Sequence, residues 1–503
     1  MKKALLIGLA VCLGVALAAP AMAIDWSATG YIGIGYLLHK NLPQGPNLGH
    51  GGILPMPGGV GIEGLGIAVA WGSPTAGGSL HDDWNDDNSY VQTRAHLKLT
   101  ARASEDLYGV FHFEMDSTAW GEAGAGGNSI GAWGTDQVAV EVKNLYIDFR
   151  VPPSLPVWIR AGMQTFLVRP GWFFVRDGAG VSARIMFDPI KLMIRPMWAH
   201  EAENQAWQAD DMDLYGFDAS IPIGPVKVGG FFLFENQREV GGTVLVPAVS
   251  DASEVWWLGV YADGKFGPVK FVIDFAYDQG EWDRPLPNAD VDFQGWGING
   301  TVDATFGIFN VGLGGLYYSG GDGRDFTLSP TDRDYGWFIR PGGSEATGTL
   351  DDSVIFGGWV SWHGPGVGHM NQPFQWNQDI WGNPAGYNAS MAGIWGIRVF
   401  ASVQPISWLK LFAQVGYWGD TTDNGDTYGS RYNPIAGWYE DHSEIGWEFD
   451  FGAHVNIYKN LMLKTAFGYL FGGSAIEQWN PALGFNEDPS DPWAWHSCLV
   501  YTF

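Results

Sequence analysis

Apolar and polar residues alternate with a period of two along most of this chain. Residues 91–102 show the pattern well: the odd positions are mostly apolar, and the even positions are Gln92, Arg94, His96, Lys98, Thr100 and Arg102. Such alternation predicts a β-strand with one apolar and one polar face. Residues 107–115 repeat the pattern after the short turn 104–106, so the two segments are expected to form a hairpin.

The same unit recurs along the chain. It predicts eighteen strands, over residues 26–38, 89–103, 107–118, 138–151, 157–169, 181–187, 190–199, 212–221, 226–235, 254–264, 268–278, 291–303, 306–318, 391–403, 408–418, 444–457, 461–471 and 493–503. Most are close to the roughly 9–11 residues that a tilted strand needs to cross a bilayer. Sixteen strands remain an alternative, because two of these strands are short. Residues 353–362 are either a further strand or a flap folded into the barrel.

Short and long connections alternate between these strands. The short ones are 104–106, 152–156, 188–189, 222–225, 264–267, 304–305, 404–407 and 458–460, and the long ones are 39–88, 119–137, 236–253, 319–390, 419–443 and 472–492. Short periplasmic turns and long outer loops are typical of transmembrane β-barrels. We therefore expect one domain over residues 24–503, an all-β antiparallel barrel with both termini on the periplasmic side.

Residues 1–23 are expected to form a secretory signal peptide outside this domain. Lys2 and Lys3 precede an apolar stretch, and Ala21-Met22-Ala23 has the small residues of a cleavage site. Of the two cysteines, only Cys498 follows the cleavage site, so no internal disulfide is expected in the mature chain. An exported chain of this kind fits a bacterial envelope.

Composition and charge narrow the class of protein further. Without Lys2 and Lys3, the 27 basic residues fall to 25 against 54 acidic ones, a formal charge of −29, which argues against nucleic-acid binding. The chain has 72 Gly and 26 Trp and only 16% charged residues, yet no mature segment of 18 consecutive apolar residues. A transmembrane β-barrel reconciles these features, because its membrane signal is spread over short alternating strands.

The C-terminal segment DPWAWHSCLVYTF ends on an aromatic strand. Its predicted outward face consists of Trp493, Trp495, Ser497, Leu499, Tyr501 and Phe503. The terminal Tyr501 and Phe503 resemble the sorting signal that the outer-membrane barrel assembly machinery reads. A core strand of a soluble β-sandwich is the alternative interpretation.

The chain resembles a Gram-negative outer-membrane porin, and more narrowly the homotrimeric porin family of sulfate-reducing bacteria. The resemblance lies in AMA followed by IDWSATGYIGIGY, in TRAHLKLTARASEDLYGVFHFEM, in WIRAGMQTF and in the final VYTF. It implies a trimeric, water-filled, passive channel surrounded by outer-membrane lipid and lipopolysaccharide. General porins have sixteen strands and sugar-specific porins eighteen, so the solute stays open.

Basic residues are expected to line the lumen. Arg94, His96, Lys98 and Arg102 share the polar face of one strand, opposite the face that must meet lipid. The same alternation places further basic residues inward: Arg160, Arg184, Lys191, Arg195, Lys227, Lys270, Arg398, Lys410 and Lys464. Either these basic residues select anions, or they only hydrate the lumen.

Acidic residues crowd the long loops, as in HDDWNDD at 81–87 and DTTDNGD at 420–426. Such loops predict a negative outer mouth. Bound calcium at 423–426 is the alternative to a merely solvated rim, and no other cofactor is expected. Residues 171–180 and part of 319–390 are the candidates for a loop that narrows the lumen. Glu114, Asp116 and Asp177 are the expected acidic side of that constriction.

These patterns favour an open channel for small hydrophilic solutes or ions and give no support to an enzyme. A lipid-facing hydrolase needs adjacent Ser and His, whereas Ser497 and His496 point to opposite faces. Inward Trp158 and Phe412 are candidates to stack a ligand. Two further functions stay open: a structural barrel or adhesin with a filled lumen, and a channel specific for sugars or carboxylates.

Overall fold

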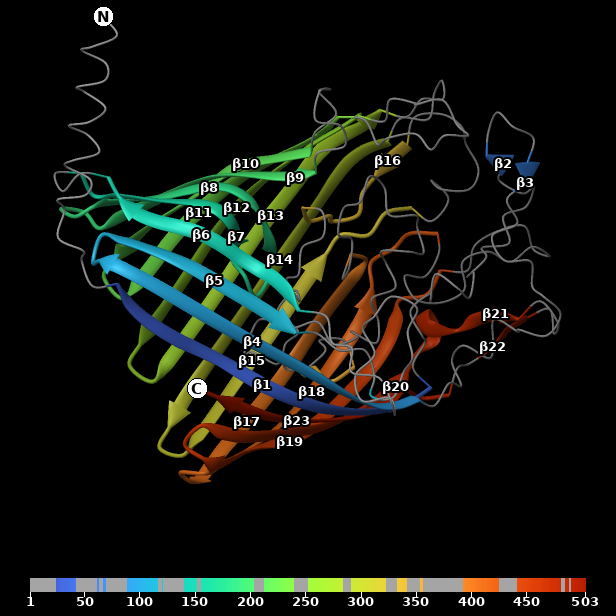
Figure 1. Ribbon diagram of the computed structural model, residues 1–503. Helices are drawn as coiled ribbons and strands as arrows, with labels where there is room; N and C mark the ends of the chain where they lie inside the picture. Colours follow the sequence, from blue (N-terminus) through green and yellow to red (C-terminus); the bar gives the residue numbers. More distant parts are fainter. Residues whose placement is uncertain are drawn as a thin grey trace, which may run out of the picture.

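The computed structural model describes most of the strands and part of the connections (Figure 1). The described residues are 24–41, 61–62, 67–68, 88–115, 120, 140–151, 155–202, 212–238, 252–283, 291–322, 333–341, 353–355, 392–424, 441–480, 485–487 and 490–503. The predicted signal peptide lies outside them. No helix among these residues is long and apolar enough to span a membrane.

The described strands form one closed antiparallel barrel. Its eighteen strands are β1 (Asp25–Lys40), β4 (Asn88–Ser104), β5 (Leu107–Met115), β6 (Glu141–Arg150), β7 (Val157–Val168), β8 (Phe174–Phe187), β9 (Leu192–Ala202), β10 (Met212–Ile223), β11 (Val226–Arg238), β12 (Ala252–Phe266), β13 (Val269–Asp283), β14 (Val291–Phe306), β15 (Phe309–Tyr318), β17 (Ile394–Ile406), β18 (Leu409–Asp420), β19 (Glu444–Tyr458), β20 (Leu461–Gly472) and β23 (Trp493–Thr502). Strand β1 pairs with both β4 and β23, which closes the sheet.

Shorter elements accompany the barrel. They are β2 (Gly61–Ile62), β3 (Ile67–Ala68), β16 (Arg333–Tyr335), β21 (Gln478–Asn480), β22 (Phe485–Glu487) and the 3-10 helix η3 (Ser474–Ile476). Strand β16 pairs with β14 in parallel. It is counted as the nineteenth strand of the main sheet but is not one of the eighteen strands of the closed wall.

The barrel prediction is confirmed, with eighteen strands rather than sixteen in the closed wall. One predicted boundary was wrong, and one open alternative is partly described. Strand β8 begins at Phe174, so most of the segment 171–180, expected to be a loop, is strand. Of the possible additional strand 353–362, Ser353–Ile355 is described and is not part of a strand, and the remainder lies outside the described residues.

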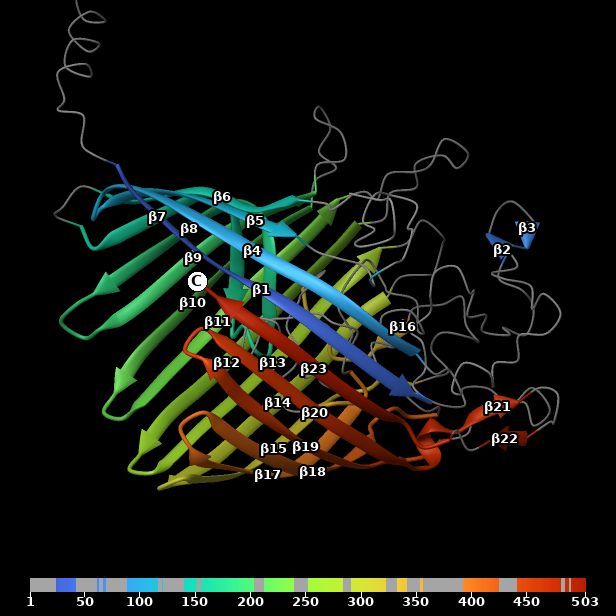
Figure 2. The ribbon, with the colours of Figure 1, turned by 60° about the horizontal axis from the view of Figure 1, so that its bottom comes forward.

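The short connections gather at one end of the barrel, where β1 begins and β23 ends (Figures 1 and 2). The last residue is part of the closing seam: the backbone N–H of Phe503 donates to the carbonyl of Gly30, and the N–H of Gly30 donates to the carbonyl of Phe503. This arrangement follows from an even number of strands, since each hairpin returns the chain to the same end.

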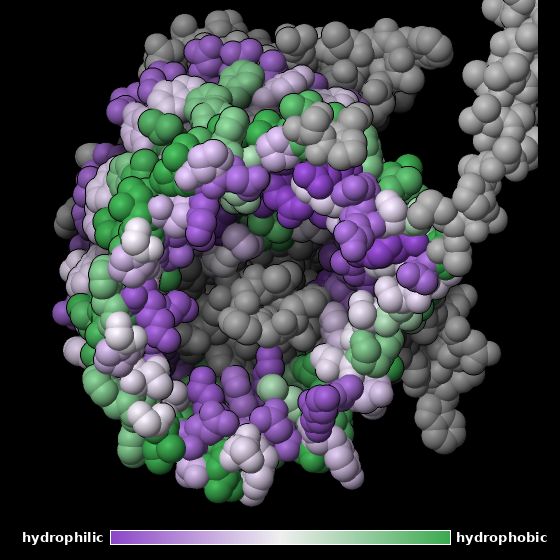
Figure 3. Space-filling view, turned by 90° about the vertical axis from the view of Figure 1, so that its left-hand side faces the viewer, coloured by the Kyte–Doolittle hydropathy of each residue, from purple (hydrophilic) through white to green (hydrophobic). Residues whose placement is uncertain are grey.

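The two faces of the wall differ as the alternation predicts. On β23, Trp495 and Tyr501 are exposed on the outer face, as is Phe503 directly after the strand, whereas His496 and Cys498 are buried inside. The outward hydroxyl of Ser497 lies 2.8 Å from that of Thr465 on the neighbouring strand, so this polar pair is mutually hydrogen-bonded. Figure 3 shows an apolar outer surface and a hydrophilic inner rim around a hollow.

Candidate pore lining and constriction

A hairpin formed by β7 and β8 leaves the barrel wall. Strand β7 pairs with β6 only as far as Met163, and β8 pairs with β9 only from Ala179. Between these points, the two strands pair with each other alone. We call residues 163–179 the crossing hairpin. Figure 2 shows the corresponding teal ribbon running inward from the wall.

Two paired glycines mark the bend. Gly162 and Gly180 lie opposite each other and have φ angles of 125° and 159°, which residues with a Cβ rarely adopt. A Cβ would also collide with the carbonyl oxygen of Leu145 at the first position and of Trp198 at the second. Only glycine therefore allows the hairpin to turn into the lumen while its strands stay paired.

Replacing Gly162 by Ala should destabilise the barrel by about 1–3 kcal/mol, because the strained φ angle and the backbone collision both oppose a methyl group. The loss should appear as a lower temperature of the heat-induced mobility shift on gel electrophoresis. Gly109→Ala is the matched control, since the nearest atom to its Cβ would be 3.8 Å away. Equal shifts in both variants would contradict a special role for the bend.

The tip of the crossing hairpin reaches the opposite wall. The Arg169 guanidinium pairs with Asp263 at 3.1 Å, pairs with Asp274, and lies 4.3 Å from the ring centre of Tyr261. These three residues belong to β12 and β13, about a hundred positions away in sequence. The hairpin therefore spans the lumen instead of lying along one wall.

Aromatic residues beside the tip secure it further. The indole N–H of Trp172 donates to the Tyr318 hydroxyl at 2.7 Å, and the Phe173 ring lies 4.6 Å from that of Phe231. Trp172 and Phe173 are both buried. Residues of 171–180 thus fold inward, as predicted for a constriction, but as the end of a strand hairpin.

The base of the hairpin is held by a charged network on the near wall. The Lys143 ammonium lies 2.8 Å from Asp177 on the hairpin and 2.6 Å from Glu114 on the wall. Glu114 also pairs with Arg94 and lies 3.3 Å from His96. The predicted residues Arg94, His96, Glu114 and Asp177 are thus brought together. Glu114 was expected to face the basic residues of β4 across the lumen. It instead pairs with Arg94 on the same wall.

Two histidines adjoin this network. The imidazoles of His96 and His112 are 3.1 Å apart at their closest nitrogens, and His112 lies 3.0 Å from the Asn144 side-chain oxygen. The Asn144 amide in turn donates to Asp177 at 2.9 Å. The hairpin base is therefore tied to β5 and β6 by hydrogen bonds as well as by ion pairs.

A part of the predicted constricting region 319–390 also folds inward. The backbone N–H of Ile339 donates to Asp278 on β13 at 3.2 Å, and the Arg340 guanidinium donates to the carbonyl of Trp172 at 3.0 Å. Farther along, the backbone N–H of Ile355 donates to Glu448 on β19 at 2.8 Å. Buried wall carboxylates thus hold segments that lie on the lumen side.

Several predicted basic residues are compensated by wall acids. Arg160 pairs with Asp148 at 2.8 Å, and Arg195 pairs with Asp218 at 3.1 Å. Lys227 lies 3.1 Å from Asp263. The prediction for Lys191 was wrong: it lies in the turn between β8 and β9, not on the wall.

Lys98, Arg102 and Arg184 have no ion pair among the residues that the structure describes. Arg102 lies 4.8 Å from the ring centre of Tyr108, and Arg184 lies 5.5 Å from that of Trp158. An aromatic face orients a guanidinium without neutralising it, so these cations keep their charge toward the lumen. Trp158 thus supports Arg184 on its ring, whereas Phe412 meets His454 edge-on at 5.6 Å.

A pocket of about 270 Å³ lies between the base of the crossing hairpin and the wall of β7–β9. Its lining includes Trp158, Arg160, Phe166, Arg184, Arg195 and Met197. Three guanidinium groups line it together with the carboxylate of Asp148, which pairs with Arg160.

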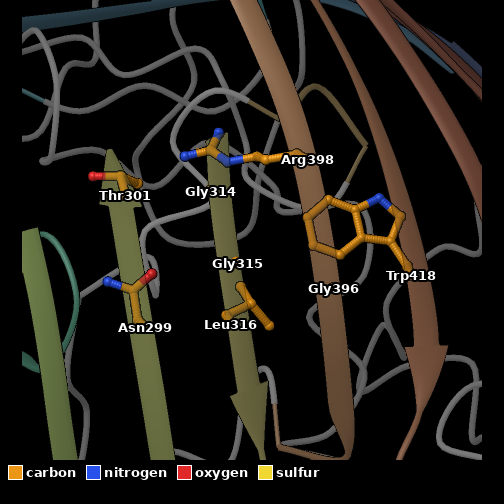
Figure 4. A pocket seen from close by; sticks show the side chains of 8 residues that line it. All are labelled: Asn299, Thr301, Gly314, Gly315, Leu316, Gly396, Arg398 and Trp418. Atoms are coloured by element: carbon orange, nitrogen blue, oxygen red, sulfur yellow. The ribbon is translucent and has the colours of Figure 1, made fainter. Parts of the chain in front are cut away.

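Arg398 lies flat along another part of the wall. It crosses Gly314 beside Thr301, and its guanidinium donates to Gln414 at 3.2 Å (Figure 4). A Cβ at Gly314 would come within 2.8 Å of this guanidinium, so glycine gives it room. The small pocket beside it measures about 10 Å³, enough for little more than a water molecule.

Some predicted features lie outside the described residues. They are Asp116, most of the acidic loops, and Gly425 and Asp426 of the possible calcium loop. In the part of the chain that is described, no cluster of three or more His, Cys, Asp or Glu side chains is placed to hold a metal ion.

Sequence reasoning missed the residues that make the constriction. Gly162, Gly180, Lys143 and Arg169 were not singled out, and neither were the acidic partners on β12 and β13. Asp residues at inward positions, such as Asp274, could have predicted such a contact. A buried carboxylate on the inner wall needs a cationic partner from elsewhere in the chain.

Comparison with known proteins identifies the fold. No family model and no curated protein matches the chain. Among solved structures, OccK9 (OpdG) of Pseudomonas aeruginosa matches with a TM-score of 0.50 and 9% identity, over 95% of this chain and 98% of that chain. OccK8 (OprE) of the same organism has a TM-score of 0.49 at 9% identity, and OpdK with vanillate 0.47 at 10%, over the same shares of the chains.

At this level of identity, the OccK9 likeness shows a shared fold and nothing finer. The chain has the closed eighteen-stranded barrel of outer-membrane channels. The narrower resemblance to the porins of sulfate-reducing bacteria stays a prediction.

Proposed function

We propose that this protein is an outer-membrane porin, a water-filled channel for the passive diffusion of small hydrophilic solutes or ions. The observation that carries the proposal is a closed barrel with an apolar exterior and a charged inner wall, narrowed by the crossing hairpin (Figure 3). A closed barrel has no edge strand to expose to lipid, and charged groups along the wall lower the barrier for ions.

The proposed setting is the bacterial outer membrane, in contact with lipid and lipopolysaccharide. The chain would reach it by export with the signal peptide and insertion by the barrel assembly machinery, and it would act as a homotrimer. In this proposal the protein has no catalytic step and needs no cofactor, since transport runs down the solute gradient.

A structural barrel or adhesin with a filled lumen is the second candidate. It is favoured by the segments held inside the wall, such as Trp337–Arg340 and Ser353–Ile355. Planar-bilayer recording of the purified protein separates the two functions. We expect discrete conductance steps from a porin, whereas a sealed membrane after verified insertion would support the filled barrel.

We further propose a weak preference for anions, with small carboxylates as the favoured class. Its support is a group of three cations, Lys98, Arg102 and Arg184, that have no ion pair among the described residues. Arg184 also lines the pocket beside the crossing hairpin. Charges in a narrow segment beside low-dielectric protein are less screened than charges on solvated loops. The wall should therefore outweigh an acidic mouth at moderate salt.

Replacing Lys98, Arg102 and Arg184 together by Gln should shift the reversal potential in a salt gradient toward cation selectivity. The reason is that the variant removes three positive charges that have no ion-pair partner in the part of the chain that the structure describes. The double variant Arg94→Gln with Glu114→Gln is the control, because it removes both charges of an ion pair and leaves the net charge of the wall unchanged. An unchanged reversal potential in the triple variant would mean that these residues hydrate the lumen without selecting anions.

A further inference from the structure

Two imidazoles meet at the base of the crossing hairpin, on the paired wall strands β4 and β5. Nδ1 of His96 lies 3.1 Å from Nε2 of His112, and the two rings meet edge-on with their centres 4.8 Å apart. We call these two residues the histidine pair. A contact of this length between two ring nitrogens is a hydrogen bond only when one nitrogen carries a hydrogen and the other a lone pair.

The second ring nitrogen of His112 is a donor. Its Nδ1 lies 3.0 Å from Oδ1 of Asn144. The other end of that amide fixes its orientation, because Nδ2 of Asn144 donates to the Asp177 carboxylate at 2.9 Å and to the Lys143 carbonyl at 2.8 Å. Oδ1 of Asn144 can therefore only accept, and Nδ1 of His112 carries a hydrogen.

The second ring nitrogen of His96 also carries a hydrogen. Nε2 of His96 lies 3.3 Å from Oε2 of Glu114, and both side chains are buried. The carboxylate is ionised because it pairs with Arg94 and Lys143, so it presents only lone pairs to the ring. With one further hydrogen in the contact between the rings, the histidine pair holds three hydrogens on four nitrogens, which amounts to one positive charge.

The surroundings of the histidine pair leave a second positive charge uncompensated. Only two of the facing groups, Glu114 and Asp177, are acidic near neutral pH, and both already pair with Lys143. These two carboxylates stand against Arg94, Lys143 and the single charge of the pair. In the part of the chain that the structure describes, the titratable groups that face the pair are Tyr31 of β1, Arg94 and Lys98 of β4, Glu114 of β5, Lys143 of β6 and Asp177 of the crossing hairpin.

We propose that the histidine pair makes the crossing hairpin sensitive to pH: it holds one positive charge at neutral pH and releases the base of the hairpin when it takes up a second proton. The second proton places hydrogens on both nitrogens of the 3.1 Å contact, so the hydrogen bond is lost and two like charges repel. The separated imidazolium of His112 then competes with Lys143 for Glu114 and Asp177, and Lys143 is the side chain that ties the wall to the hairpin.

The acid range in which histidine changes its charge lies near neutral pH, at about pH 5–8. The tip of the hairpin stays attached through Arg169, so acid should loosen the constriction without removing it. The effect on conduction rests on the proposed channel function, whereas the number of protons on the pair does not depend on it.

Nitrogen-15 NMR of the folded protein with labelled histidine tests the number of protons. In detergent micelles at neutral pH, the four ring nitrogens of His96 and His112 should show three protonated nitrogens and one with a lone pair, or the exchange average of that state. Acid should protonate the fourth nitrogen. His96→Gln and His112→Gln assign the signals. Two neutral rings at neutral pH, or two fully protonated ones, would overturn the proposal.

Single-channel recording tests the release of the hairpin. Acidifying both chambers from about pH 8 to about pH 5 should raise the open-channel current noise severalfold and reversibly. In His96→Gln and His112→Gln the noise should depend much less on pH, because no contact between imidazoles is left to break. His454→Gln is the matched control, since β20, β23 and β1 separate its strand β19 from β4, and it should respond as the unmodified protein does.

The outcomes separate this inference from the channel function. Equal responses to pH in the unmodified protein and in His112→Gln would refute the release of the hairpin, while the conductance itself leaves the channel function standing. A folded protein that never conducts contradicts the channel function instead, and the NMR spectrum then decides the number of protons by itself. Heat-induced mobility shifts verify that each barrel is folded, and if one Gln variant fails to fold, the other decides.

Discussion

Replacing residues 164–178 by an Asn-Gly turn should raise the single-channel conductance severalfold. Met163 and Ala179 face each other at the point where the crossing hairpin leaves the wall, so a two-residue turn can join β7 and β8 there. The variant removes the segment that reaches from β7 and β8 to Asp263 and Asp274 on the opposite wall. A wider lumen then carries more ions at the same voltage. Conductance in planar bilayers at high salt is the measurement.

A milder variant keeps this prediction testable if the shortened chain folds poorly. Arg169→Ala leaves the hairpin in place but removes its ion pairs with Asp263 and Asp274, so the open channel should become noisier and somewhat larger. Arg150→Ala is the control, because its partner Asp106 is in the adjacent turn and the pair lies outside the constriction. A shortened, folded barrel with unchanged conductance would place the narrowest point elsewhere.

Replacing Phe503 by Asp should lower the amount of assembled protein in the outer membrane severalfold while leaving folding in detergent nearly intact. In the folded barrel, Phe503 contributes two backbone hydrogen bonds to Gly30, but β1 and β23 remain paired from Tyr31–Thr502 to Lys40–Trp493 without its side chain. The side chain is 43% exposed and makes a small contribution to the core. Its main expected role is recognition during assembly.

Two measurements separate assembly from stability. Outer-membrane fractions give the amount of inserted protein, and refolding of the purified chain in detergent gives the intrinsic folding yield. Tyr458→Asp is the matched control, since Tyr458 is an aromatic residue with 72% exposure at another short turn. Normal outer-membrane levels of Phe503→Asp, or equal losses in the control, would argue against a C-terminal signal.

The wall of the barrel was predictable from local patterns. The alternation at residues 91–102 gave both the strand β4 and the face that meets the lumen, because side chains on a strand point to opposite sides in turn. The alternating connection lengths placed the ends of the strands. The alternation of apolar and polar residues did not predict the first half of β8, because Gly178 and Gly180 interrupt it there.

The sequence predicted which charged side chains share the inner face of one strand, but not which of them pair with charges on a neighbouring strand. Arg94 and Lys98 have the same inward position on β4 and the same sequence pattern, yet Glu114 neutralises Arg94, while Lys98 has no ion-pair partner among the described residues. Which of the two is compensated depends on the register between β4 and β5, which pairs His96 with Glu114 and Lys98 with His112. No periodicity within one strand contains this information.

The sequence was sufficient for the antiparallel barrel and for the inner and outer faces of its strands, because both follow from neighbours along the chain. It left sixteen strands open beside eighteen, and the structure decided for eighteen. The tertiary structure alone decided that the hairpin at Gly162 and Gly180 bends into the lumen and that Arg169 binds Asp274, 105 positions away. These features arise from contacts across a closed barrel, whose partners are brought together only when the first and last strands meet.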